Sequence, residues 1–326
     1  YGQTSSELFR YTWTNTINVN KDFANGHSLN AVAGMEMFQG KWYTSNFTGY
    51  DLNSDMMQSP AGIGDKSGSS LFPPSIGGGR TMSNLMSFFA QASYSIANKY
   101  NFSASLRHDT SSKFYEDNAS ATFWSVGASW LISSESWFDN AKWLNQLKLR
   151  ASYGTTGNQD GVSDFGTFDG YYNSSYNGES GYSHGQLGNS ELRWETSAQT
   201  NVGLDVSVLD SRVNVTFDFY NIKTKDLYMS KNISMTSGFS SILANAGSIV
   251  NRGVELGVNT TPVKTQNFQW DLGFNYTYNK SEITDLGTWS NKEGRYKNGN
   301  TLYELGRPLG RSEEHTSELQ SLFAIS

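Results

Sequence analysis

The chain has 326 residues with 30 acidic and 24 basic side chains, which leaves a formal net charge of −6. No basic run has the density that nucleic acid requires, so we expect no nucleic-acid partner. The absence of cysteine excludes disulfides and thiolate metal sites. Mean hydropathy is −0.53 and no apolar run is long enough for a membrane-spanning helix, whereas half-apolar membrane strands average to such values.

Alternation of apolar and polar residues predicts about ten β-strands along the chain. In order, their apolar positions are Tyr11, Trp13, Ile17 and Val19; Leu29, Ala31, Ala33, Met35 and Met37; Phe88, Ala90, Ala92 and Tyr94; Tyr100, Phe102, Ala104 and Leu106; Trp124, Val126, Ala128 and Trp130; Leu147, Leu149, Ala151 and Tyr153; Val202, Leu204, Val206 and Val208; Val213, Val215, Phe217 and Phe219; Val254, Leu256 and Val258; Trp270, Leu272, Phe274, Tyr276 and Tyr278. The clearest signal is residues 202–219, where two alternating runs flank a short turn and predict an antiparallel hairpin.

The connections between these strands alternate in length. Short connections are expected at 20–27, 97–99, 210–211 and 261–267; longer ones are expected at 40–84, 108–121, 131–146, 154–194 and 225–250. This alternation is typical of an up-and-down barrel, which has short turns on one side and long loops on the other. The medium connection at 131–146 is the exception in this chain. A Greek-key sandwich has no reason to alternate its loops in this way.

Aromatic residues near the ends of the apolar faces fit the girdles of a membrane barrel, although the same rings would also fill a soluble core. They are Tyr94, Phe102, Trp130, Tyr153, Trp194, Tyr220, Trp270 and Tyr278. Loop alternation favours the membrane interpretation. We therefore expect an all-β fold: an antiparallel up-and-down transmembrane β-barrel, incomplete, with about ten strands of a larger barrel and open edges.

Residues 145–160, NQLKLRASYGTTGNQD, resemble the SusC/RagA family of TonB-linked outer-membrane transporters. The resemblance continues in order at 87–114, which looks like a family strand pair ending in an arginine-x-aspartate turn, and at 192–228. It also covers 246–263 and 268–286, the strands with the asparagine-x-glycine-x-glutamate and asparagine-lysine motifs.

The resemblance implies the later-middle strands of a plugged 22-stranded barrel in the cell outer membrane, spanning residues 1–310. It implies import of oligosaccharides, or peptides, with a SusD-like surface lipoprotein as lid and outer-membrane lipid around the wall. TonB would act through a plug region outside this sequence, and we expect the signal peptide and TonB box to lie outside it as well.

The last sixteen residues, 311–326, depart from this pattern. The string RSEEHTSELQS, residues 311–321, resembles the in-frame translation of a sequencing-library adapter. We expect this tail not to be biological; a genuine charged terminal helix is the alternative.

The sequence predicts no catalytic, cofactor-binding or metal-binding residues, and hence no enzyme. His27, His108, His184 and His315 are scattered without metal-ligand spacing. Three acids, Asp160, Asp164 and Asp169, could chelate calcium, but their spacing is not that of an EF-hand, and solvated loop acids are the preferred interpretation.

One loop, residues 165–185, is the candidate contact surface. It carries Tyr171, Tyr172, Tyr176 and Tyr182 among small polar residues, a composition that suits stacking on sugars or docking a lid protein. The alternative is that these rings pack on one another or on neighbouring loops.

Two other classes of function remain open at this stage. A passive porin or a surface adhesin would share the barrel and its loops. A soluble carbohydrate-binding or hydrolytic β protein would keep the same strands with the wet face reversed.

Overall fold

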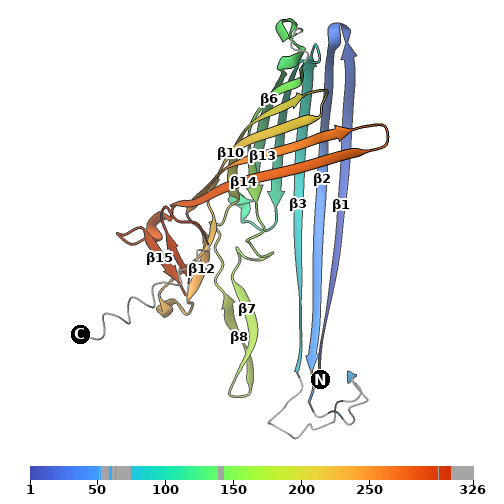
Figure 1. The fold of residues 1–326 in the computed structure, drawn as a ribbon. Coiled ribbons are helices and arrows are strands. Elements are labelled where there is room, and N and C mark those ends of the chain that lie inside the picture. Colours follow the sequence, from blue (N-terminus) through green and yellow to red (C-terminus); the bar gives the residue numbers. More distant parts are fainter. Residues whose placement is uncertain are drawn as a thin grey trace, which may run out of the picture.

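The computed structural model describes residues 1–50, 52, 59–60, 63, 75–138, 143–299 and 301–309. The tail expected at 311–326 lies outside the described residues, so that expectation stays a prediction. The described chain forms one sheet of ten antiparallel strands (Figure 1). Its strands, in spatial order, are β1 (Gly2–Phe23), β2 (His27–Thr48), β3 (Ser75–Ile96), β4 (Tyr100–Ser111), β5 (Ser120–Leu131), β6 (Leu144–Asn158), β9 (Glu195–Val208), β10 (Val213–Lys225), β13 (Ser248–Lys264) and β14 (Gln269–Asp285).

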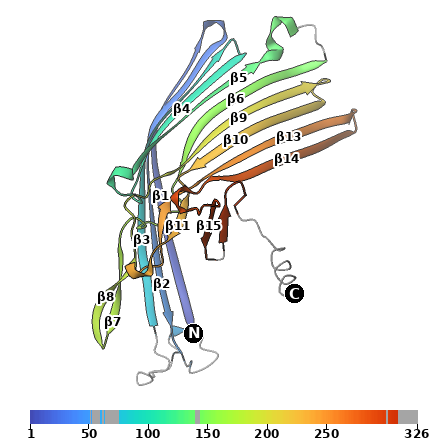
Figure 2. The ribbon, with the colours of Figure 1, turned by 90° about the vertical axis from the view of Figure 1, so that its left-hand side faces the viewer.

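All ten predicted strands are present, and each pairs with its neighbour along the chain. The sheet is a curved wall that does not close, because β1 and β14 pair on one side only (Figure 2). The expected open antiparallel sheet is therefore confirmed. The prediction of an arginine-x-aspartate turn at Arg107–Asp109 is wrong, because both residues lie within β4.

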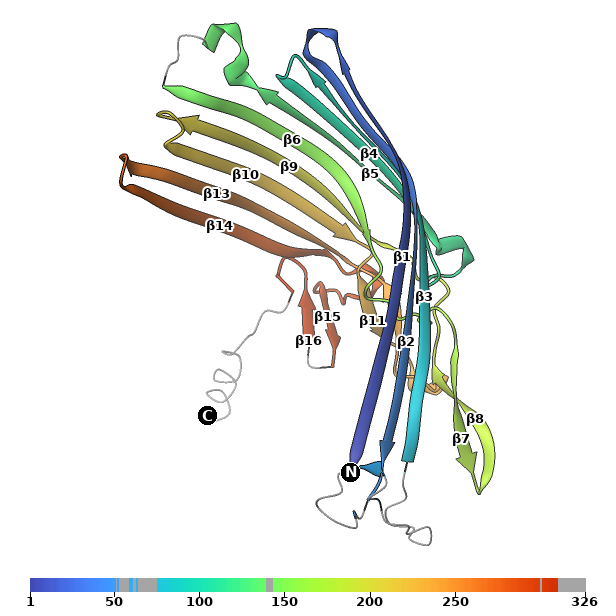
Figure 3. The same cartoon turned by 90° about the vertical axis from the view of Figure 1, so that its right-hand side faces the viewer.

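The tight connections gather at one end of the wall, which we call the turn end, and the longer ones at the other, the loop end (Figure 3). Connections 24–26, 97–99, 209–212 and 265–268 lie at the turn end. Residues 97 and 98, and 209 to 211, adopt the left-handed backbone conformation that such tight reversals require. The connection at 132–143 is longer and contains two 3-10 turns, η4 (Ile132–Ser134) and η5 (Ser136–Phe138).

Strands β2 and β3 are much longer than the sequence pattern indicated. They pair from Ser28 and Ser95 through Thr48 and Ser75, so the long connection expected at 40–84 is wrong and shrinks to 49–74. Apolar–polar alternation does not mark these parts of β2 and β3, because both faces of the sheet carry polar residues and glycines there, such as Gly77 and Gly78.

Three small hairpins project from the loop end and were not predicted. They are β7 (Gly170–Tyr176) with β8 (Glu179–Gln186), β11 (Tyr228–Asn232) with β12 (Ser241–Asn245), and β15 (Arg295–Asn298) with β16 (Thr301–Glu304). The remaining elements are the 3-10 turns η1 (Ala24–Gly26), η3 (Glu116–Asn118), η6 (Met235–Ser237) and η7 (Gly287–Trp289). Within the described ranges, no helix has the length and apolarity needed to cross a membrane.

The register gives the sheet one apolar and one polar face. Phe217 lies opposite Leu204 and Leu256, and Leu256 lies opposite Tyr276, so four strands share one apolar row. The adjacent row on the other face is Asp205, Thr216, Gly257 and Asn275. Since Phe274 is 59% exposed and no second sheet covers the apolar face in the described part of the chain, a two-sheet soluble sandwich is contradicted.

Two of the expected girdle aromatics lie elsewhere. Tyr220 is on the polar face, because it pairs with Asn201 and its ring lies over Gly253. Trp194 precedes β9 and is buried in a small core at the loop end. That core contains Phe114, Phe123, Val162, Leu192 and Trp194.

The apolar face predicts how charge is tolerated on β10. In the full-length protein, Phe217→Arg should lower the free energy of unfolding in lipid by about 2–4 kcal/mol, because a cation is costly at the middle of an apolar band. Thr216→Arg is the matched control, since the neighbouring side chain points to the polar face. The measurement is the folded fraction of each variant after reconstitution into vesicles. It is read from the heat-dependent mobility shift on a gel. Equal loss in the two variants would contradict the assignment of faces.

Candidate functional site: the polar face and the loop end

An ion-pair network lies on the polar face across β6, β9 and β10. The Arg150 guanidinium donates to both carboxylate oxygens of Asp205 at 2.9 Å and to Asp218 Oδ2 at 3.0 Å. Gly203 lies between Arg150 and Asp218 in the register, and a Cβ there would stand 2.4 Å from Asp218 Oδ1 and 2.7 Å from Arg150 Nη2. The glycine therefore makes room for the network.

This network borders a hollow of about 300 Å³ on the same face. Lys148, Arg150 and Asn201 line it together with serines of β4, β5 and β6. The buried Oδ1 atoms of Asn201 and Asp218 have no hydrogen-bond partner among the described residues. Of these two residues, Asn201 lines the hollow and Asp218 does not.

A second network on the polar face is centred on Arg107. Its guanidinium contacts Asp109 at 2.7 Å, Ser87 Oγ at 2.8 Å and Glu36 at 3.0 Å, and it lies 5.9 Å from the ring centre of Phe89. From sequence, Arg107 and Asp109 were predicted to lie in a turn. Arg107 was not paired with Ser87 or Glu36, because these partners lie 20 and 71 positions away along the chain.

Loop contacts at the loop end are organised by Tyr228. Its hydroxyl lies 2.9 Å from the Arg193 carbonyl oxygen and 3.0 Å from that of Asn158, and it accepts the Glu195 N–H at 3.2 Å. Burial raises the pKa of Tyr228 above its usual range, so the hydroxyl stays protonated. The ring covers Gly161, whose Cβ would lie 2.5 Å from it.

Further bonds join the loop 159–194 to the loop 226–247. Arg193 pairs with Asp226 at 2.7 Å, and the Asn245 amide donates to the carbonyl oxygens of Arg193 and Asp226 at 2.8 and 2.7 Å. Trp194 Nε1 donates to the Ala119 carbonyl oxygen at 3.2 Å, and this bond joins the β4–β5 connection to the same two loops. The loop bases therefore form one bonded unit.

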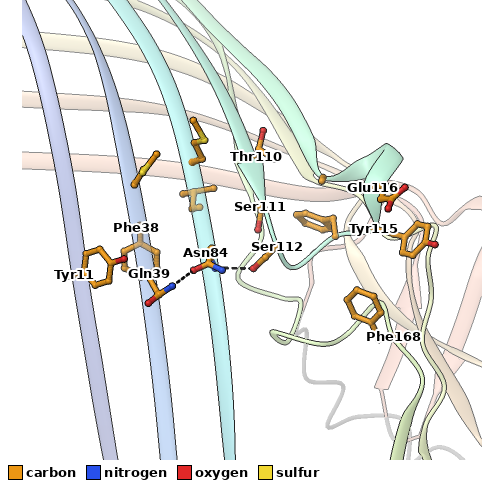
Figure 4. A pocket seen from close by; sticks show the side chains of 15 residues that line it. Tyr11, Phe38, Gln39, Asn84, Thr110, Ser111, Ser112, Tyr115, Glu116 and Phe168 are labelled. Carbon is orange, nitrogen blue, oxygen red and sulfur yellow. Dashed lines mark hydrogen bonds between the residues drawn. The ribbon is translucent and has the colours of Figure 1, made fainter.

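A pocket of about 640 Å³ opens where β4 ends and β3 continues without a partner on that side (Figure 4). Gln39 donates to Asn84 at 2.7 Å, and the Asn84 N–H donates to Ser112 Oγ at 2.8 Å. Tyr115 and Phe168, which come from the neighbouring loops, form the far wall of the pocket. Their rings are in edge contact, with 6.2 Å between ring centres.

The four tyrosines predicted as a contact surface lie on the β7–β8 hairpin and divide between its faces. Tyr171 pairs with His184 and Tyr182 pairs with Asn173 on one face, whereas Tyr172 and Tyr176 are on the other. Their exposed fractions are 62% and 80% for the first pair and 55% and 86% for the second. No contact in the structure tests their predicted role.

The first face of this hairpin continues onto the neighbouring loop. His184 lies 4.5 Å from Tyr171 and 6.0 Å from Phe239 between ring centres. Phe239, which follows η6, was not part of the sequence prediction, because its closeness to His184 depends on the folding of two separate loops.

The acids considered for calcium make separate contacts. Asp164 lies 4.0 Å from Lys113, and Asp169 Oδ1 accepts the Gly188 N–H at 2.9 Å. Among the residues that the structure describes, no group of three histidine, cysteine or acidic side chains is arranged to hold a metal.

An antiparallel wall with one apolar and one polar face, tight turns at one end and large loops at the other defines the class of outer-membrane β-barrels. The chain belongs to the TonB dependent receptor-like β-barrel family, whose model matches residues 1–317. The polar face therefore faces the barrel interior and the apolar face faces lipid in the outer membrane.

Two curated relatives support this assignment. TonB-dependent receptor P39 of Formosa agariphila is 35% identical over 299 residues, which are 91% of this chain and 28% of that protein. TonB-dependent receptor SusC of Bacteroides thetaiotaomicron is 36% identical over 214 residues, 63% of this chain and 21% of that protein.

Solved structures agree in fold. The RagAB peptide transporter superimposes with a TM-score of 0.83 and 27% identity, over 94% of this chain and 34% of that chain. The siderophore receptor PiuA from Acinetobacter baumannii, at 14% identity and a TM-score of 0.57, shares the fold alone. The chain thus spans less than a third of the two curated relatives and about a third of the RagAB chain.

The close approach at Gly203 predicts a sensitive position on the polar face. Gly203→Ala should lower the free energy of unfolding of the full-length protein by about 1–3 kcal/mol, because the methyl group displaces Asp218 from Arg150 and leaves partly buried charges less well paired. Gly273→Ala is the control, since its Cβ would meet only the Asn259 side chain, at 3.3 Å. Thermal unfolding in detergent distinguishes them; an unaffected Gly203→Ala would contradict the packing described.

Proposed function

We propose that this chain forms part of the wall of an energy-coupled importer that takes up oligosaccharides, or peptides, through the barrel interior. The observation that carries the proposal is the charged, hydrogen-bonding polar face on a membrane barrel of the TonB-dependent receptor family. Its networks and hollow suit a hydrated conduit for a polar solute. The described side chains perform no covalent chemistry on it in this proposal, and TonB supplies the energy through a plug outside this chain.

One structural neighbour supports the peptide class in the proposal, because it is titled a peptide transporter. The exposed rings of the β7–β8 hairpin favour sugars, because aromatic faces stack on them, and we keep oligosaccharide as the first candidate. A SusD-like surface lipoprotein would close the loop end as a lid.

Uptake by cells that express the full-length protein tests this proposal. We expect labelled oligosaccharides to accumulate only when the gene, TonB and the proton gradient are all present. A panel of labelled peptides of similar size runs in parallel. Uptake that persists without TonB or the gradient would indicate a passive porin, and no uptake of either class would leave an adhesin; both results contradict the proposal.

The division of the tyrosines predicts which face of the hairpin contacts ligand or lid. Tyr171→Ala with Tyr182→Ala should reduce uptake or lid binding severalfold, because these rings share a face with His184 and lie next to the loop that carries Phe239. Tyr172→Ala with Tyr176→Ala is the matched double variant on the opposite face. Lid binding by pull-down and uptake at several substrate concentrations separate the two contacts. Unchanged values in both double variants would remove the hairpin from the site.

A further inference from the structure

The apolar face of β10, β13 and β14 ends abruptly toward the loop end. Its last apolar row is Phe219, Val254 and Tyr278. The next row on the same face is Asn221, Arg252 and Lys280, and the row after that contains Lys223 and Glu282 on either side of Val250. Because rows on one face are two residues apart, the first cations lie about 7 Å beyond the apolar surface.

These cations are poorly compensated. Arg252 and Lys280 lie directly opposite one another, an arrangement of like charges that destabilises a sheet. Glu282 pairs with Lys280, while Arg252 donates to the neutral Asn221 side chain at 3.0 Å. We call Lys223, Arg252 and Lys280 the outer cationic patch; all three are exposed, and with Glu282 they carry a net charge of +2, three cations less one acid.

A cavity of about 610 Å³ adjoins the patch at Lys223. Lys225 and Ser248 line it from the strand ends, and Thr288 and Trp289 line it from the loop that follows β14. The two acids at its rim are occupied: Asp226 pairs with Arg193, and Asp285 accepts the Gly287 N–H. The patch therefore has a polar recess beside it for a large headgroup.

A similar arrangement occurs near the other edge of the sheet. On the lipid-facing side of β2 and β3, the row of Met37 and Met86 is followed by Gln39 and Asn84, and then by Lys41 and Arg80 in the next two rows. Within the described ranges neither cation has a carboxylate partner, and Arg80 lies 5.2 Å from the ring centre of Tyr43. Cations thus border the apolar face at the same end on two separate parts of the wall.

We propose that the outer cationic patch binds the phosphate of an outer-leaflet lipid whose acyl chains lie on the apolar rows of β10, β13 and β14. Continuity with the apolar face favours a lipid over a soluble anion, because only an amphiphile occupies both surfaces at once. The phosphate places negative charge between Arg252 and Lys280, and the adjoining cavity accepts the rest of the headgroup. This inference depends on the membrane position of the wall and not on what the protein imports.

The test is native mass spectrometry of the purified full-length protein in detergent, titrated with phosphate-bearing lipid A. The double variant Arg252→Gln and Lys280→Gln should bind the lipid about tenfold or more weakly, because two cations near the headgroup are removed. Glu282→Gln should bind it more tightly, because Lys280 is released from its ion pair. This opposite effect keeps the test decisive if the double variant folds poorly.

Lys292→Gln is the matched control, because this exposed lysine lies outside the sheet, in the β14–β15 connection, and does not line the cavity beside the patch. Dephosphorylated lipid A and inorganic phosphate are titrated in parallel, and the wild-type protein should bind both more weakly. Equal binding of the dephosphorylated lipid, equal binding of inorganic phosphate, or an equal loss in Lys292→Gln would each overturn the proposal.

Discussion

The structure depends on one constraint: backbone hydrogen-bonding groups that face lipid must be satisfied within the sheet. The ten strands meet it by pairing with their neighbours in one antiparallel sheet, apart from the outer sides of β1 and β14. The register of this pairing also fixes the face on which the side chains lie. A slip of one residue in β10 against a fixed β9 would turn Asp218 toward lipid and Phe217 toward the interior. The apolar face, the interior ion pairs and the cations at the loop end all follow from this register.

Charge is handled differently on the two faces. In the interior, Arg150 and Arg107 are each held by two carboxylates, so each network has one more negative than positive charge. On the lipid side, charge is excluded from the apolar rows of β10, β13 and β14 and reappears as cations next to the final apolar row. The wall therefore meets three environments: the barrel interior, the lipid, and the membrane surface beside the cations. On the lipid side, the change from apolar to cationic residues occurs within one row.

Much of the wall could be predicted from sequence because alternation is a local signal. The residues at 202–219 give the hairpin β9–β10 directly, and the ten strands follow in the same way. The outer halves of β2 and β3 could not be predicted, since beyond the membrane both faces are wet and alternation disappears. The placement of Trp194 and Tyr220 was wrong because the strand start and the parity of a position decide the face, and these were uncertain by a few residues.

The contacts of the candidate site were harder to predict from sequence. Nothing local in the sequence pairs Arg150 with Asp218, because the pairing passes through the register of three strands and the absence of a side chain at Gly203. Likewise, the tyrosines were recognised as a group, but their division between two faces depends on a hairpin with a bulge after Gly170. Composition identifies such a loop, whereas its geometry requires the fold.

The bonded loop bases have a consequence for how such a protein diversifies. Tyr228, Arg193 and Asn245 anchor two large loops near the wall, while the β7–β8 tip projects freely beyond them. Lengthening a free tip adds little closure entropy, about 0.6 kcal/mol for each doubling of loop length. Changes in the length or sequence of this tip can therefore alter the exposed surface of the loop end without refolding the wall beneath it.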